Sequence, residues 1–320
     1  MRHTFFIIII IFSIGCVEEF NLDIDKTPPR LVVEGLITNQ DGPYSVRLTK
    51  SNPELIYLDT VDVLSDNAIP IMDAMVIISD NYGLSDTLIP SPLYKKCIKY
   101  IFDDHYNIID SILDTCENKY SIAKGFYETT NILGVTGRTY TLKIILKNNE
   151  EYLATSFMPE LPPIDSLTYE YRILEKEKSE IIVPKIFFKD PSNQENYYLF
   201  QLITDDIDYS LSPYKKWNFS IISDRFLKSD VSIGLYIDDG ASPNGLDYYI
   251  YPHRTIHVVV NMYSLTKEAY DFYNSLFNQF NNDGGAFSPA PSSPESNISN
   301  GAIGFFRASS VNKEEIFIER

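Results

Sequence analysis

Three cysteines, four histidines and several acidic clusters are the side chains of this chain with the greatest chemical capacity. None of them lies in a nucleophile elbow, a zinc-binding helix, a phosphate-binding loop or a dinucleotide-binding glycine motif. Such motifs place a nucleophile, a metal ligand or backbone N–H groups at the spacing that the chemistry needs. We therefore expect no catalytic residue, no metal ligand and no cofactor, and a protein that binds its partner without converting it.

Cys16 is the cysteine with the clearest context, because it follows a basic start, an apolar run and Gly15. The apolar run is much shorter than the roughly 20 residues of a membrane-spanning helix, so residues 1–15 are predicted to be a cleaved signal peptide. Gly15–Cys16 resembles the bacterial lipobox, in which the cysteine is acylated and starts the mature chain. Ser13 departs from the lipobox, which usually has Leu at that position. The alternative is an ordinary secretory signal with a free Cys16.

Glu18 and Glu19 directly follow the predicted acylation site. The pair resembles the acidic export signal that sends Bacteroidota lipoproteins to the outer face of the outer membrane; a solvated acidic linker is the alternative. Residues 16–30, which include Pro28–Pro29, are expected to form an extended tether. Because two or three acyl chains anchor a protein stably, we expect lipid anchoring in the outer membrane, at the cell surface.

Cys97 and Cys116 are the remaining cysteines. In an exported protein such a pair favours a disulfide, and closing a loop of about 20 residues would stabilise the fold by roughly 3 kcal/mol. Metal binding by the two thiols with His105 is the alternative, but no C-x-x-C motif or second nearby histidine supports it. His253 and His257 lie four positions apart on a predicted strand, too far for one metal ion.

Acidic and tyrosine clusters are further candidates for binding. Asp103–Asp104, Asp205–Asp208 and Asp238–Gly240 carry oxygen ligands suited to calcium, but none has the EF-hand spacing, and solvated turns are the alternative. Tyr197–Tyr198 and Tyr248–Tyr251 would suit stacking on sugars or on a protein partner. Neighbouring strand residues point to opposite faces, so half of these rings are expected in the core.

Four Asp-Ser/Thr-apolar triplets resemble the O-glycosylation sites of exported Bacteroidota proteins. Attachment at exposed turns would fit the expected compartment. The candidate acceptors are Thr60, Thr87, Ser111 and Ser166.

The net charge of the chain limits the classes of partner that it can bind. It has 44 acidic and 27 basic residues and a net charge of −17. Nucleic acid and an anionic lipid face would both be repelled, whereas cations or basic partners would be favoured. High acidity also serves solubility alone, which is the alternative interpretation.

The elements that must position these residues are mostly strands, because Val, Ile, Thr, Tyr and Phe are abundant and strand-length stretches alternate apolar with polar residues. Residues 31–160 are expected to form an immunoglobulin-like or transthyretin-like β-sandwich, and Leu161–Pro163 a boundary. The strands are expected at 31–38, 44–50, 74–79, 84–89, 125–127, 137–146 and 152–158.

Residues 164–320 are expected to form a second mainly β domain with one amphipathic helix that starts at an N-cap, Thr266. Its aromatic stripe is interpreted as a core face. Residues 301–308 are expected to return as a strand and close this second domain. The loops Asp238–Asp247 and Phe287–Asn300 are longer than a minimal β fold requires, so they are candidates for a partner surface. The other strands are expected at 166–172, 181–189, 197–204, 217–222, 246–251, 255–265 and 315–318.

These segments also carry a family resemblance that covers nearly the whole mature chain. The motifs, in order, are Leu31–Gly35, Ala74–Ile78, Gly125–Tyr127, Gly134 to Leu142, Tyr152–Met158, Pro163–Leu167, Asp190–Pro191, Tyr197–Tyr198 and Asn297–Ala308. Together they resemble the Bacteroidota lipoproteins of domain of unknown function family 4249. The resemblance implies two mainly β domains and association with TonB-dependent transporters, with no catalytic residues to carry over. Ser91–Lys119 departs from the family as a disulfide-tied insertion.

The sequence thus predicts a surface-exposed outer-membrane lipoprotein that is not an enzyme and serves as an accessory or binding protein beside a TonB-dependent barrel. A small-molecule, peptide or glycan ligand is not identified by the sequence. One alternative is a structural or adhesive surface lipoprotein without a transport partner. A second alternative is a carboxylate-dependent hydrolase, for which the chain has acids but no framing motif.

Overall fold

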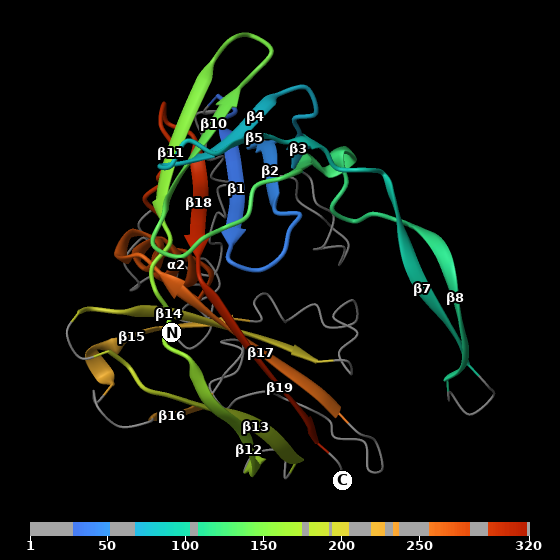
Figure 1. Ribbon diagram of the computed structural model, residues 1–320, viewed down its shortest axis with the longest axis vertical. Helices are drawn as coiled ribbons and strands as arrows, with labels where there is room; N and C mark the ends of the chain where they lie inside the picture. The colour runs from blue at the N-terminus through green and yellow to red at the C-terminus, as the bar shows by residue number, and fades with distance from the viewer. Residues whose placement is uncertain are drawn as a thin grey trace, which may run out of the picture.

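The computed structural model is mainly β, as predicted, with a single α-helix among the residues it describes (Figure 1). It describes residues 28–51, 68–102, 108–174, 179–191, 194–204, 219–227, 233–236, 256–281 and 294–318.

Two sheets form a first sandwich from the N-terminal half of the chain. Their inner faces meet in one core, in which Val33 and Leu48 of one sheet pack with Ile78 and Leu142 of the other. Period-two alternation builds this core, because every second residue of a strand such as Thr139–Ile145 is buried. One sheet has the order β18 (Ile303–Ser309), β1 (Leu31–Thr38), β2 (Ser45–Lys50), β9 (Phe126–Glu128), β6 (Ile89–Pro90), with β3 (Ile69–Pro70) on β2; the other has the order β11 (Glu151–Phe157), β10 (Thr139–Ile145), β4 (Met75–Asp80), β5 (Ser85–Thr87).

A second pair of sheets follows the boundary. Their core joins Ile186 and Phe188 on one side to Phe200, Val260 and Met262 on the other. The first sheet has the order β12 (Ile164–Leu174), β13 (Ser179–Phe188), β16 (Ile233–Tyr236); the second has β15 (Phe219–Ser223), β14 (Tyr197–Thr204), β17 (Ile256–Leu265), β19 (Val311–Ile318). Two short 3-10 helices, η1 (Ile122–Lys124) and η2 (Asp224–Phe226), lie between strands.

β18 is where the structure differs from the sequence-based expectation. We expected residues 301–308 to close the C-terminal domain, but β18 instead pairs in parallel with β1 at the edge of the first sandwich. Only Ser310 separates it from β19 in the second sandwich, so one extended segment runs through both halves of the molecule (Figure 1). Gly304 permits the pairing, because a Cβ atom there would lie 2.0 Å from the Val33 carbonyl oxygen.

The helix α2 (Lys267–Asn281) begins as predicted, since the Thr266 hydroxyl accepts a hydrogen bond from the Ala269 N–H at 3.2 Å. Its apolar side packs on Tyr197 and Leu265 of the second sandwich and on Phe305 of β18. The interpretation of the aromatic stripe as a core face is therefore confirmed for Ala269, Phe272 and Tyr273. The helix fills the corner between the two sandwiches and helps to hold them together.

Candidate functional site

A two-stranded hairpin extends away from the first sandwich (Figure 1). Its strands, β7 (Tyr94–Phe102) and β8 (Ile108–Glu117), pair only with each other among the described strands. Nine residues of strand span about 30 Å, so the hairpin reaches well beyond the sandwich. The sequence indicated an insertion here and missed its strands. We call residues 94–117 the arm.

The base of the arm is fixed to the body by buried polar groups. The Asn118 side chain donates to the Ser91 hydroxyl at 3.1 Å and to the Pro92 carbonyl at 2.9 Å. The Asn118 N–H donates to the Leu93 carbonyl at 2.8 Å. Ser91 in turn donates to Glu128 of β9 at 2.5 Å. These bonds set the direction in which the arm leaves the sandwich.

The predicted disulfide is confirmed, because Cys97 and Cys116 are bonded across the arm with a Cα–Cα distance of 5.9 Å. Cys97 lies opposite Asp114 in the register, and Cys116 lies opposite Lys95, so the bond is a diagonal link between the strands. A hairpin of two strands is marginal by itself in water. The disulfide therefore supplies stability that packing on the body does not.

One face of the arm presents large apolar side chains to solvent. Residues paired across an antiparallel ladder share a face, which places Tyr94, Ile98 and Leu113 together with Lys96 and Ser111. The three apolar residues are 63%, 59% and 71% exposed. We call this the docking face.

The opposite face of the arm is more polar. It carries the disulfide, Lys99, Asp110 and Asp114, with Ile101 and Ile112 as its large apolar residues. On the docking face, Ile98 and Leu113 lie opposite each other and form an exposed apolar pair, and Tyr94 lies four positions before Ile98 on the same face, with Lys96 between them. Exposed apolar surface of this kind is typical of interaction sites.

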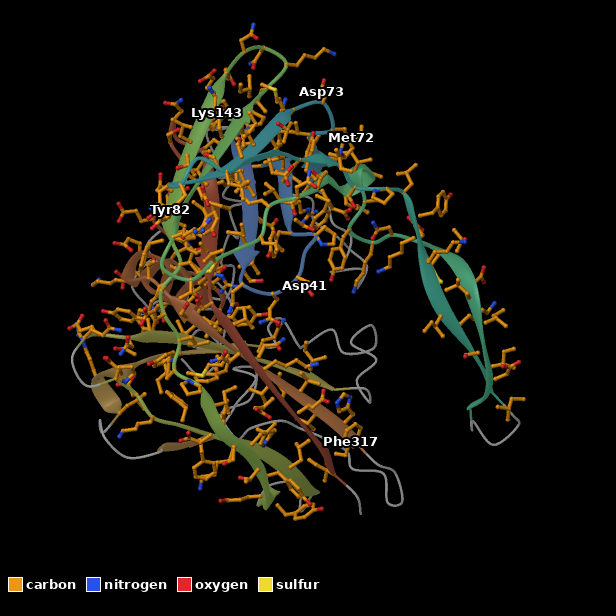
Figure 2. All side chains as sticks on the ribbon, viewed as in Figure 1. Asp41, Met72, Asp73, Tyr82, Lys143 and Phe317 are labelled. Carbon is orange, nitrogen blue, oxygen red and sulfur yellow. A yellow bond between two sulfur atoms is a disulfide. The ribbon has the colours of Figure 1, made fainter. Side chains whose placement is uncertain are left out.

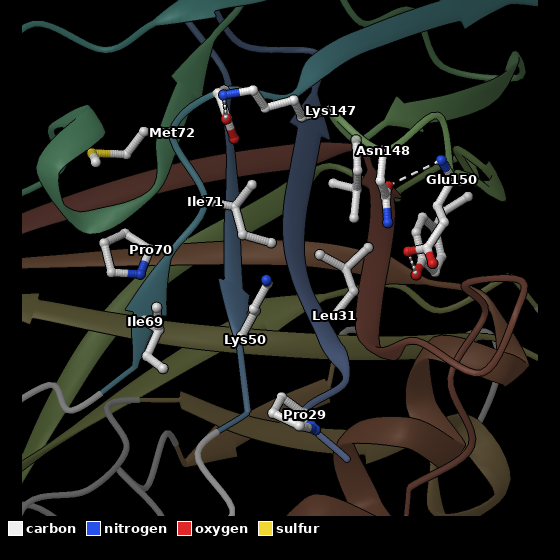
Figure 3. Close-up of a pocket in the computed structure, with 13 residues that line it drawn as sticks. Pro29, Leu31, Lys50, Ile69, Pro70, Ile71, Met72, Lys147, Asn148 and Glu150 are labelled. Atoms are coloured by element: carbon white, nitrogen blue, oxygen red, sulfur yellow. Dashed lines mark hydrogen bonds and ion pairs between the residues drawn. The ribbon is translucent and has the colours of Figure 1, made fainter.

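A groove of about 540 Å³ lies beside β3 and Lys50, the last residue of β2 (Figure 3). Figure 3 shows Ile69, Pro70 and Met72 beside it, with Pro29 one residue after the start of the described chain. Its rim includes an ion pair between Lys147 and Asp73 at 3.4 Å. The walls mix these apolar residues with Lys50, Asn148 and Glu150, so the groove lacks the mainly apolar lining that is typical of a small-ligand site.

A second hollow of about 710 Å³ lies between the end of β11, the residues before β14 and the start of α2. The nearby Asp190 carboxylate accepts a hydrogen bond from the Tyr198 hydroxyl and from Asn196. Burial, followed by the bond to Asp190, raises the pKa of Tyr198, and burial raises the pKa of Asp190. Both groups are satisfied by each other, so this pair holds the fold here and offers no free nucleophile.

Tyr197 and Tyr198 are therefore not a stacking platform. Both are buried, on opposite faces of β14: Tyr197 packs on Tyr270 of α2 and Tyr198 on Phe188. The alternation of side chains along a strand explains the outcome, since both faces of this central strand are covered.

Only residues 294–300 of the loop Phe287–Asn300 are described, and residues 287–293 lie outside the described residues, so its role as a partner surface stays a prediction. Asn297 exchanges hydrogen bonds with the Phe306 backbone at 2.8 and 2.9 Å, and Asn300 donates to the Glu151 carbonyl at 2.6 Å. Ile298 is buried in the first core. Residues 294–300 thus fasten β11 to β18.

Three of the four candidate glycosylation sites are described, and all three hydroxyl residues are exposed. Thr87 ends β5, Ser111 lies on β8 and Ser166 on β12, so they lie on strands and not in the expected turns. The Asp86 that precedes Thr87 is buried, and its carboxylate accepts bonds from three N–H groups of Thr130, Asn131 and Ile132 and from the Thr130 hydroxyl. Although burial raises its pKa, these bonds outweigh burial and leave the Asp86 pKa below its usual value.

Other sequence-predicted sites lie outside the described residues, where the structure does not test them. They are Cys16, Glu18, Glu19, Thr60, His105, His253, Asp103–Asp104, Asp205–Asp208, Asp238–Asp247 and Tyr248–Tyr251. Within the described ranges, no group of three His, Cys, Asp or Glu side chains is placed to hold a metal ion. His257 lies 3.4 Å from Glu315 and stacks on Phe317. No helix in the described part of the chain has the length and apolar character to cross a bilayer.

A family model described as domain of unknown function (DUF4249) matches residues 17–315. No curated protein matches the chain.

Proposed function

The chain belongs to the DUF4249 family, and from that premise we propose that it is a Bacteroidota lipoprotein of the outer-membrane surface that binds a TonB-dependent transporter through its arm. The transporter is the partner class that the sequence resemblance implies. The observation that carries a binding role is the docking face, where Tyr94, Ile98 and Leu113 are exposed on a hairpin that pairs with no other described strand.

The energetics of the docking face support a binding role. Burying one large apolar side chain contributes about 1.5–3 kcal/mol, so the Ile98–Leu113 pair together with Tyr94 can contribute much of the binding free energy of an interface. Cys97–Cys116 fixes the conformation before binding, which lowers the entropic cost of association. No described strand pairs with either outer edge of the arm, so each edge offers a partner a strand to pair with.

The proposed anchor places the first sandwich near the membrane. Twelve peptide units link Cys16 to Pro28, where the described chain begins, and at about 3.6 Å per residue they span at most about 43 Å. The groove that includes Pro29 lies at this entry point. An acylated Cys16 would therefore hold the first sandwich within reach of the extracellular loops of a barrel.

The docking role is tested by changing one face of the arm at a time. The variant Ile98→Ser/Leu113→Ser removes apolar area from the docking face, and Ile101→Ser/Ile112→Ser removes it from the opposite face. We expect the first variant to lose co-purification with a barrel in mild detergent and the second to keep it. Equal recovery of the barrel with both variants, or no barrel with the parent protein, would contradict the proposal.

The anchor is tested separately. Cys16→Ala should release the protein from the membrane fraction, and Glu18→Ala/Glu19→Ala should keep it in the membrane but protect it from protease added to whole cells. A Cys16→Ala protein that still partitions into detergent would refute acylation. Unchanged protease sensitivity of the glutamate variant would refute the export signal.

Ser111 connects the predicted glycosylation with the proposed docking, because this candidate acceptor lies on the docking face. A glycan attached there would cover Leu113 and its neighbours and would exclude a protein partner from that face. Mass spectrometry of the arm peptide from purified protein therefore reports on both: occupied Ser111 in the barrel-bound fraction would contradict docking through this face.

A further inference from the structure

Arg307 is a buried cation at the corner between the two sandwiches. It lies on β18 and is only 7% exposed. Its Nε and Nη1 atoms are buried and have no hydrogen-bond partner among the residues that the structure describes. The guanidinium carbon lies 5.0 Å from the ring centre of Tyr263 and 5.2 Å from that of Tyr273. Two aromatic rings thus contact the charge, but no acceptor satisfies these two donors.

Side chains of β18 point alternately to its two faces, and this places Arg307 at the corner. Phe306 and Ala308 point into the first core, so Arg307 and Ser309 point to the other side of the strand. Tyr263 comes from β17 and Tyr273 from α2, so three elements meet at the guanidinium. The Ser309 hydroxyl is also fully buried and without a partner.

The aromatic environment is held in place by further polar contacts. The Tyr263 hydroxyl donates to the Gln201 side-chain oxygen at 3.0 Å, and the Asn261 amide reaches the same oxygen at 3.5 Å. The hydrogen bond from the Tyr263 hydroxyl to Gln201 holds the tyrosine ring beside Arg307. The two rings lie against the guanidinium group, but they do not supply an acceptor for its Nε and Nη1 atoms.

Buried N–H donors of a charged group that have no acceptor are unfavourable in a protein. Contact with two aromatic rings offsets only part of this cost, because the rings attract the charge without accepting its N–H protons in the guanidinium plane. Guanidinium groups bind carboxylate and phosphate oxygens especially well. We propose that Arg307 is the centre of an anion-binding site that takes a carboxylate or phosphate group of a small ligand, with Ser309 as a second donor.

The position of this site gives the ligand a structural consequence. β18 pairs with the first sandwich and leads through Ser310 into β19 of the second, while α2 packs on both. An anion at Arg307 would link β18 to the helix and to β17. Binding should therefore stabilise the junction between the two halves of the chain.

The site is tested by thermal unfolding of the mature protein in phosphate, in succinate and in sodium chloride of equal ionic strength. We expect one of the two anions to raise the midpoint by at least about 2–4 °C over sodium chloride. Arg307→Met should lose this shift, and Arg307→Lys should keep only part of it. Lys147→Met removes an 83% exposed cation and should behave as the parent.

A purely structural arginine would give different results. No shift with either anion, or an equal shift in Arg307→Met and the parent, would overturn the proposal. If Arg307→Met does not fold, the arginine Nε resonances of the folded parent are followed in a titration with the same two anions, with Arg307→Lys as the assignment control. One saturable shift is expected, at the Arg307 resonance, and its absence with both anions would also overturn the proposal.

Discussion

Removal of the Cys97–Cys116 disulfide should loosen the arm and leave the two sandwiches intact. The cysteines are 19 positions apart, and a closed loop of this length disfavours the open state by about 3 kcal/mol in the chain-entropy model. Because β7 and β8 pair with no other described strand, this free energy acts on the local opening of the arm. It corresponds to a roughly 100-fold larger opening constant.

Hydrogen–deuterium exchange of Cys97→Ser/Cys116→Ser measures this effect peptide by peptide. Amides of the arm should exchange roughly 100-fold faster than in the parent, whereas amides of β10 in the first core should be unchanged. If the bond instead stabilised the whole fold, the thermal midpoint would fall by roughly 6–12 °C. A fall of that size, or unchanged exchange in the arm, would refute the view that the arm is an independent unit.

Two further predictions concern the first sandwich. Asp86→Asn should lower the free energy of unfolding by about 2–4 kcal/mol at pH 7, because four hydrogen bonds end on the carboxylate. The pKa of Asp86 is lower in the folded than in the unfolded state, so its contribution to the free energy of unfolding is fully present above the unfolded pKa of about 4 and is lost as pH falls through the lower folded value. Urea titrations should therefore show the stabilities of the parent and the variant converging at low pH. A stability difference that stays constant with pH would contradict this. Gly304→Ala should destabilise by more than the roughly 1–3 kcal/mol of its left-handed backbone, because the new Cβ also meets the Val33 carbonyl. Gly301→Ala is the control, with a positive φ but open space around the Cβ position, and equal losses in the two variants would show that the contact with β1 is unimportant.

Many strands could be predicted from the sequence because their apolar and polar residues alternate with period two. Leu31–Thr38 begins and ends where the sequence indicated, and so does Tyr197–Thr204, although both faces of that strand are buried. The start of α2 was also predictable, since Thr266 combines an N-cap hydroxyl with a helical apolar stripe. Local pattern and final structure agree in these segments because tertiary packing reinforces what the pattern favours.

The arm was not predictable by the same means. Its strands expose apolar residues on both faces, so Ile98 and Ile101 do not follow the alternation that marks a half-buried strand. Two cysteines about 20 residues apart with β-branched residues between them were the available signal, and they were interpreted only as a disulfide-tied insertion. A stapled hairpin needs no core face, which is why the amphipathic criterion missed it.

The position of β18 and the burial of Arg307 required the tertiary structure. A strand pattern gives no partner, and β18 pairs with a strand more than 260 positions earlier in the chain, as Val32 opposite Ile303 shows. An arginine in a strand is expected at the surface. Only the meeting of β17, β18 and α2 shows that Arg307 is enclosed.

Site-specific photo-crosslinking in whole cells tests docking through the arm most directly. A photoreactive residue at Leu113 lies on the docking face, and one at Phe317 serves as the control. Phe317 is similarly exposed, at 60%, but lies at the far end of β19 (Figure 2). The account predicts a covalent adduct with an outer-membrane barrel from position 113 and none from position 317. Adducts of equal yield from both positions, or none from position 113, would contradict it.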